Sequence, residues 1–273
     1  MRDKSILLDA LDLHLHTSPD LTPRCLDDCE AAVHAADAGM SGILLKNHYG
    51  STAERAEIAG KAVKSIRVYG SLVLNESVGG LNPSAVEAAL KMGAKEIFLP
   101  TLSAANHKKG EGLASGIRLG GRDARSRIAE ILALVKEHDA ILGTGHVSKA
   151  EIFALVRSAV KAGVRKIMIT HPEHPLVNMS VGEQLQLNEE GVFFERCYAS
   201  TLPGLGDVPM GRIANEIREI GARYTVLTTD LGKAGYPTPV EGMIAYATQL
   251  LALGITQGEI DSMIRDNPRS LVE

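Results

Sequence analysis

The feature that most constrains the fold is an alternation of short apolar runs with helical patterns along the whole chain. Eight runs have the length and the branched or aromatic residues of buried strands: 8–16, 41–48, 69–77, 95–101, 139–146, 165–171, 191–199 and 223–230. Helical patterns lie between them, as at 26–40, 151–163 and 212–221. Strands that alternate with helices form parallel sheets, because each crossover helix covers the sheet. The alternation therefore predicts an α/β protein.

The helix boundaries support the same reading. A Ser or Thr followed three residues later by Glu is a typical helix start, and it occurs at Ser51–Glu54, Ser148–Glu151, Ser180–Glu183 and Thr238–Glu241. Glycine recurs where a helix should stop before the next strand. Eight strand–helix units favour a closed (β/α)8 TIM barrel, regular or distorted, over a doubly wound open sheet. Without a linker or low-complexity tract, we expect one domain over residues 1–273.

Composition excludes several classes of function. The net charge is 29 − 33 = −4, so no basic field favours nucleic acid. No apolar run is long enough to span a bilayer. The three cysteines are too few for a disulfide framework, which predicts a cytoplasmic protein. Cys25 and Cys29 are four apart, and half-buried packing is favoured over a metal-binding face. We expect a small-molecule substrate as partner, and a homo-oligomer stays open.

The strand ends carry the informative polar residues. His14 and His16 lie two apart in DLHLHTSPD, so an extended strand points both imidazoles to one face. Further candidates end the later strands: Lys46, His48, Glu76, His146, His171, Glu195 and Asp230. In a barrel, the carboxyl ends of all strands converge on one face, where active sites of this fold lie. Imidazoles and carboxylates gathered there are ligands for zinc or a similar divalent ion. We therefore expect a metal site at the C-terminal strand ends.

Other polar residues have simpler interpretations. His34, His107 and His138 lie in helices or loops and are expected at the surface. His174 stands between prolines and is more typical of a loop than of a ligand. Glu195 and Arg196 are adjacent and can form an ion pair at the barrel rim.

The set of strand-end residues resembles the amidohydrolase superfamily of metal-dependent barrels. The matching residues are His14, His16, His146, His171 and Asp230. The opening DLHLHTSPD, with His48 and Glu76, is also similar to the PHP family of metal-dependent phosphoesterases. Pro100-Thr101 stands where binuclear amidohydrolases often have a carboxylated lysine, and Gly232 stands where the PHP pattern has a histidine. The resemblance leaves either Glu76 or Lys46 as the bridging group.

The resemblance implies a metal-dependent hydrolase with one or two ions. Zinc is the first expectation for the metal, with manganese, iron or nickel as alternatives. The implied ligands are His14, His16, Glu76, His146, His171 and Asp230. Asp230 would also orient water and move its proton, and His48 would bind metal or stabilise an oxyanion.

The substrate is the least constrained part of the prediction. The long stretch 102–122 follows the fourth strand and is expected above the barrel mouth. Lys46 and, from this stretch, Lys108 and Arg118 are candidates for binding an anionic substrate. The leading prediction is hydrolysis of a small-molecule amide, ester or lactone. The alternatives are a PHP-type phosphoesterase, a mononuclear-metal decarboxylase and a non-catalytic metal-binding barrel.

Overall fold

The computed structural model describes residues 4–273, and its eight strands form one parallel sheet in chain order. The strands are β1 (Leu11–His16), β2 (Gly42–Lys46), β3 (Arg67–Val73), β4 (Ala94–Phe98), β5 (Ile141–Gly143), β6 (Ile167–Thr170), β7 (Phe193–Cys197) and β8 (Thr225–Thr228). The segment after β8 closes on β1, because the amides of His16 and Asp230 donate to Leu231 and His14 carbonyls at 2.7 Å. The predicted (β/α)8 barrel is confirmed.

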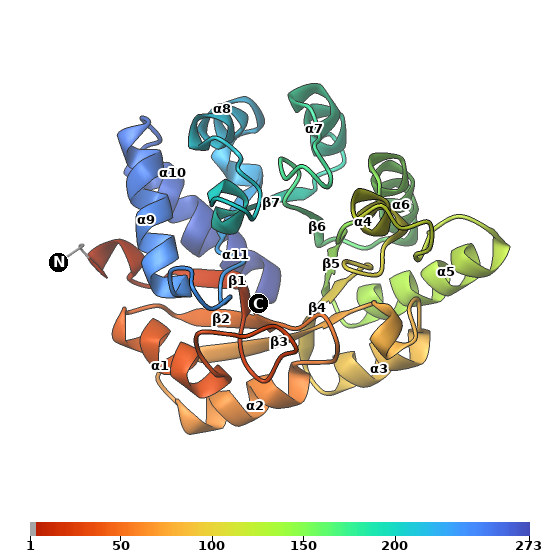
Figure 1. The fold of residues 1–273 in the computed structure, drawn as a ribbon, viewed down its shortest axis with the longest axis horizontal. Coiled ribbons are helices and arrows are strands. Elements are labelled where there is room, and N and C mark those ends of the chain that lie inside the picture. The colour runs from red at the N-terminus through yellow and green to blue at the C-terminus, as the bar shows by residue number, and fades with distance from the viewer. Residues whose placement is uncertain (1–3) are drawn as a thin grey trace.

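Helices surround the strands, as Figure 1 shows. They are α1 (Asp28–Asp37), α2 (Ala53–Ala62), α3 (Pro83–Lys91), α4 (Ala105–Gly110), α5 (Arg122–Glu137), α6 (Lys149–Ala162), α7 (Val181–Asn188), α8 (Met210–Ile220), α9 (Pro239–Ala252), α10 (Gln257–Asp261) and α11 (Asn267–Val272). Short 3-10 turns are η1 (Lys4–Leu7), η2 (Glu76–Val78), η3 (Tyr198–Thr201) and η4 (Ala222–Tyr224), and η5 (Ser262–Asp266) is a π turn. The predicted irregular stretch after the fourth strand contains the short helix α4.

Most of the predicted helix starts are confirmed. Ser148, Ser180 and Thr238 each form a capping box with the glutamate three residues later. The prediction at Ser51 is wrong, because Thr52 is the N-cap of α2 and its hydroxyl donates to the Leu45 carbonyl at 2.6 Å. Because this bond ties Thr52 to β2, helix α2 begins one residue later than the Ser51–Glu54 pattern predicts.

The barrel interior has an apolar layer below a polar one. The apolar layer consists of Leu11, Leu13, Leu44, Val73, Phe98, Ile141, Met168, Val226, Leu271 and Val272. On β2, alternation places Lys46 on the same inner face as Leu44, nearer the C-terminal end of the strand. The register of β1 shifts between Asp12 and Leu15, where the Asp12 carboxylate accepts the amides of His14 and Thr229 at 3.2 and 3.1 Å. The polar layer therefore lies at the C-terminal strand ends.

Two further expectations concern the cysteines and the membrane. Cys25 lies before α1 and Cys29 inside it, and both are free, half-buried thiols. Within residues 4–273, no helix is both long and apolar enough to cross a bilayer.

Candidate metal centre

Two histidines of β1 and the aspartate after β8 converge on one point. His14 Nε2 and His16 Nε2 each lie 3.0 Å from the same oxygen, Asp230 Oδ1. Both imidazoles are buried, whereas the Asp230 side chain is 25% exposed. The β1–β8 closure makes this meeting possible, because the Asp230 amide is bonded to the His14 carbonyl. These three ligand atoms form a group that can hold a cation.

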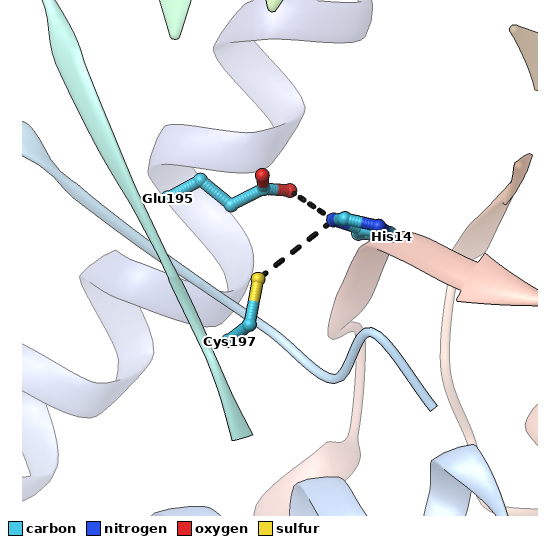
Figure 2. A group of neighbouring side chains, drawn as sticks. All are labelled: His14, Glu195 and Cys197. Atoms are coloured by element: carbon cyan, nitrogen blue, oxygen red, sulfur yellow. Dashed lines mark hydrogen bonds and ion pairs between the residues drawn. The ribbon is translucent and has the colours of Figure 1, made fainter. Parts of the chain in front are cut away.

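The opposite nitrogen of His14 faces β7. Figure 2 shows Glu195 and Cys197 directed at His14 Nδ1, which lies 2.9 Å from Glu195 Oε1 and 3.7 Å from Cys197 Sγ. These atoms form a second group of metal-binding type. Burial raises the pKa of the Cys197 thiol well above its usual range, so this sulfur remains protonated. Because a thiol must lose its proton to bind a metal, we assign this group to support His14.

This support selects the nitrogen of His14 that can bind a cation. An imidazole that donates from Nδ1 to a carboxylate has its lone pair on Nε2. The carboxylate of Glu195 therefore directs the His14 lone pair toward Asp230 and His16.

We expect Glu195→Gln to weaken metal binding about 10- to 100-fold, the usual effect of losing such a support. A neutral amide accepts the Nδ1 proton less strongly and leaves the tautomer of His14 less defined. Titration of the metal-free protein with Zn²⁺ against a chromophoric chelator measures this change. Glu96→Gln is the matched control, since Glu96 is equally buried but has no hydrogen-bond partner among the described residues. Equal affinities for both variants would contradict the assigned role of Glu195.

The charges around His14 and Asp230 reinforce each other. Burial lowers the pKa of an imidazole, but the carboxylates of Asp230 and Glu195 outweigh it and raise the pKa of His14 to about 9. Burial likewise disfavours the Asp230 carboxylate, yet His14 and His16 hold its pKa well below the usual range. Burial lowers the pKa of His16 to about 4, so His16 is neutral. In the absence of a metal, a proton on His14 thus supplies the positive charge that Asp230 needs.

The raised pKa of His14 predicts that the metal-free protein loses stability as pH rises. Such a group stabilises the fold fully below its unfolded value of 6.5, and this contribution is lost as pH rises through about 9. We expect a fall of up to about 3 kcal/mol in the free energy of unfolding, since each pKa unit is worth about 1.4 kcal/mol. Urea titrations with chelator at pH 6.5 and pH 9 measure it. His14→Gln should flatten the slope, and an unchanged slope in this variant would refute the prediction.

A second pair of imidazoles lies across the mouth. His146 Nε2 and His171 Nε2 are 3.1 Å apart, and burial holds the pKa of both rings well below the usual range. Two nitrogens bound at about 2.0–2.1 Å to one tetrahedral ion stand about 3.3 Å apart, so this spacing suits a shared cation. His48 lies between the two pairs, with ring centroids 4.8 Å from His16 and 6.4 Å from His146.

The chemistry of the donor set tests whether a metal fits. His16 Nε2 lies beside Asp230 Oδ1, and His171 Nε2 lies beside His146 Nε2, so both rings turn this nitrogen toward the cluster. Nδ1 of each ring, on the other side, is buried without a hydrogen-bond partner among the described residues and does not mark the position of an ion. Neutral imidazoles beside a carboxylate are the donor set of zinc and related ions. The residues present therefore fit a divalent metal.

Comparison with known proteins places the chain in a family. A model described as "Family of unknown function (DUF6282)" matches residues 9–195, more than half of the chain. The chain belongs to this DUF6282 family. The matched segment contains the metal-centre histidines and Glu195, whereas Asp230 lies beyond it. Among curated proteins, none matches this DUF6282 chain.

Solved structures share the fold of the DUF6282 chain at low identity. An amidohydrolase from Pseudomonas aeruginosa is 12% identical over 98% of this chain and 97% of its own, with a TM-score of 0.65. A putative 2-pyrone-4,6-dicarboxylic acid hydrolase from Pseudomonas putida is 18% identical, covers 97% of both chains and has a TM-score of 0.63. The Escherichia coli phosphotriesterase homology protein, complexed with phosphate, is 13% identical over 98% and 99%, with a TM-score of 0.64. All three comparisons support the barrel.

Three predicted site residues of the DUF6282 chain lie outside the cluster. The side chain of Glu76 is exposed at the start of η2, so it is in neither group of candidate ligands among the described residues. Lys108 is half-buried on α4, with Nζ 3.5 Å from Glu111, and Arg118 is exposed. The structure therefore does not bring Glu76 to the metal centre, because the chain turns outward after Asn75.

Lys46 lies inside the cluster. Its side chain is buried, with Nζ 2.8 Å from His14 Nε2 and 4.3 Å from the centroid of the Phe98 ring. Below it, Glu96 on β4 is fully buried, and burial with the nearby Glu195 charge holds the pKa of Glu96 well above the usual range. Glu96 is not among the site residues predicted from the sequence, although its alternation with Phe98 on β4 is a usable signal.

Glu195 and Arg196 do not pair with each other, so the interpretation of these neighbours as an ion pair is wrong. Adjacent residues of a strand point to opposite faces, so Glu195 enters the barrel while Arg196 faces the surrounding helices. Arg196 contacts Glu173 and Glu216 instead, at 3.1 and 2.8 Å. Glu195 is thereby left free to bond His14.

Proposed function

We propose that this DUF6282 protein is a metal-dependent hydrolase that acts on a small-molecule amide, ester or lactone. The observation that carries the proposal is the convergence of His14 Nε2 and His16 Nε2 on one oxygen of Asp230. A carboxylate oxygen with two imidazole nitrogens is a preformed partial shell for a divalent ion. The proposal also has support from barrels of similar fold, which include an amidohydrolase and a putative 2-pyrone-4,6-dicarboxylic acid hydrolase.

The chain offers ligands for two ions. His14, His16 and Asp230 would hold the first ion, and His146 with His171 would hold the second. Zinc is the first candidate, because imidazoles dominate the donor set. A divalent ion in such a site supplies Lewis acidity and makes water a nucleophile near neutral pH.

Asp230 is placed to move the proton of the attacking water. It is the partly exposed member of the first group, so its carboxylate faces the barrel mouth where water enters. Its lowered pKa keeps it ionised and able to accept a hydrogen bond from water. A carboxylate in this position can pass the proton to the leaving group as the bond breaks.

His48 is placed to donate a hydrogen bond to the substrate. Asn75 Nδ2 donates to Thr101 Oγ1 at 2.8 Å, so the Thr101 hydroxyl proton is free to point to His48 Nδ1, 2.9 Å away. Nδ1 of His48 then accepts, and its proton resides on Nε2. Burial keeps the pKa of His48 well below its usual range, so it acts as a neutral donor to a developing oxyanion.

Lys46, and not Glu76, is the candidate for the group that bridges the two ions. Its position beside His14 suits a substrate anion, and a carboxylated Lys46 would be an additional metal ligand. An unmodified ammonium so close to His14 Nε2 competes with a cation for that nitrogen.

The proposal is tested by restoring activity to the metal-free protein. Protein stripped with chelator is supplied with Zn²⁺ or Mn²⁺ and assayed on panels of lactones, amides, carboxylic esters and phosphate esters. The proposal expects metal-dependent hydrolysis in one of the first three panels. Activity confined to phosphate esters would favour the phosphoesterase alternative.

A further inference from the structure

Helix α4 carries a histidine directly behind the second imidazole pair. His107 Nδ1 lies 2.8 Å from His146 Nδ1, and the two ring planes differ by 15°. This separation is within hydrogen-bond distance and the ring planes are nearly parallel, so a proton on one of the two nitrogens can be donated to the other. The side chain of His107 is only 12% exposed, contrary to the expected surface position.

The opposite nitrogen of His146 faces the metal centre. His146 Nε2 is 3.1 Å from His171 Nε2, so His107 and His171 contact different nitrogens of one ring. A neutral imidazole carries one proton, which must lie on Nδ1 if Nε2 is to bind a cation. His107 Nδ1 is then the acceptor of that proton.

The second nitrogen of His107 faces the carboxylate of Glu111. When His107 accepts at Nδ1, its own proton lies on Nε2, which is 3.4 Å from Glu111 Oε1. Glu111 is 49% exposed, so this row of groups begins at the surface and ends at His146. It repeats the arrangement of Glu195 and His14, with one imidazole inserted between the carboxylate and the ligand.

The position of α4 holds this row in place. Asn106 Nδ2 donates to the carbonyls of His146 and Leu176 at 3.2 and 2.7 Å, which ties the helix to the end of β5. The amide of Ala105 donates to the Ile117 carbonyl at 2.8 Å and closes the base of the segment. The Asn106 side chain therefore ties α4 to His146, while the Ala105–Ile117 bond closes the α4 segment on itself.

We propose that His107 is a positioning residue that fixes the metal-binding tautomer of His146, with Glu111 as its outer partner. The inference rests on the proposed function, because it assigns His146 to the second ion. It adds a role for the α4 segment that is independent of substrate chemistry. It also predicts that the two ions respond differently to changes at His107.

The test compares His107→Asn with His107→Gln. The side-chain amide of asparagine can place its oxygen near the Nδ1 position and accept from His146, whereas that of glutamine reaches nearer the Nε2 position. We expect His107→Gln to weaken the second Zn²⁺ about 10- to 100-fold, the usual effect of losing such a partner, with the first ion unchanged. His107→Asn should stay within a few-fold of wild type. His138→Gln is the surface control.

Zn²⁺ affinities from chelator competition and the visible spectrum of the Co²⁺-loaded protein are the readouts, and neither needs a substrate. Equal binding of the second ion by the asparagine and glutamine variants would overturn the inference alone. Wild-type protein that binds one ion would overturn it and leave the first site intact. Wild-type protein that binds none would overturn the proposed function as well.

Discussion

Asp230→Asn is expected to abolish most of the metal-dependent activity and to weaken the first ion by at least about 100-fold. The amide keeps the shape of the side chain but removes the charge on which His14 and His16 converge. Losing a general base alone costs about 10²- to 10⁴-fold in rate. Metal titration and hydrolysis of the best substrate from the panels measure the two effects separately.

Asp207→Asn is the matched control for this experiment. Asp207 is an exposed carboxylate in the loop after η3, where it accepts the Gly204 amide at 3.2 Å. Its replacement should change neither metal affinity nor rate by more than about twofold, since isolated surface changes rarely matter. An Asp230→Asn protein that keeps wild-type affinity and rate would remove Asp230 from the site.

Arg196→Met is expected to cost about 3–5 kcal/mol of folding free energy without changing any candidate ligand. Arg196 is a fully buried residue of β7, and its side chain contacts Glu173, Glu216 and Gln184. Burial already raises the pKa of Glu173 to about 7, although the Arg196 charge opposes this. Removing the cation leaves the buried Glu173 carboxylate without its ion-pair partner. Urea unfolding at pH 8, where Glu173 is largely ionised, gives the largest effect.

Arg212→Met provides the comparison for Arg196. Arg212 also pairs with Glu216, at 2.8 Å, but its side chain is 35% exposed. Water and salt screen such a pair, so its loss should cost about 1 kcal/mol or less. Similar losses of folding free energy in both variants would mean that the burial of Arg196 does not make its ion pairs more important for stability.

The fold was predictable because its signal repeats. Each strand–helix unit carries an apolar run, and several carry a capping residue, so an error at Ser51 does not change the count of units. The histidines at the strand ends were predictable for the same reason, since parallel strands bring their carboxyl ends to one face of the barrel. His14 and His16 meet Asp230 across the line of closure, as the strand-end argument requires.

The rest of the site depends on contacts that local patterns do not encode. Glu76 follows Val73 by three residues, and the period of two fails once β3 ends. Asn75 points inward instead and binds the Thr101 amide at 2.9 Å, while Glu76 starts η2 at the surface. His107 reads as a surface residue because only the docking of α4 on β5 brings it to His146.

The most direct test of the account is to count metal in protein purified without chelator, beside a His14→Ala/His16→Ala double variant. Elemental analysis should find two divalent ions per chain in the wild type and the loss of at least one in the variant. One ion in the wild type would leave the His14–His16–Asp230 site and remove the second. No ion in either protein, even after incubation with Zn²⁺ and Mn²⁺, would contradict the metal-dependent function.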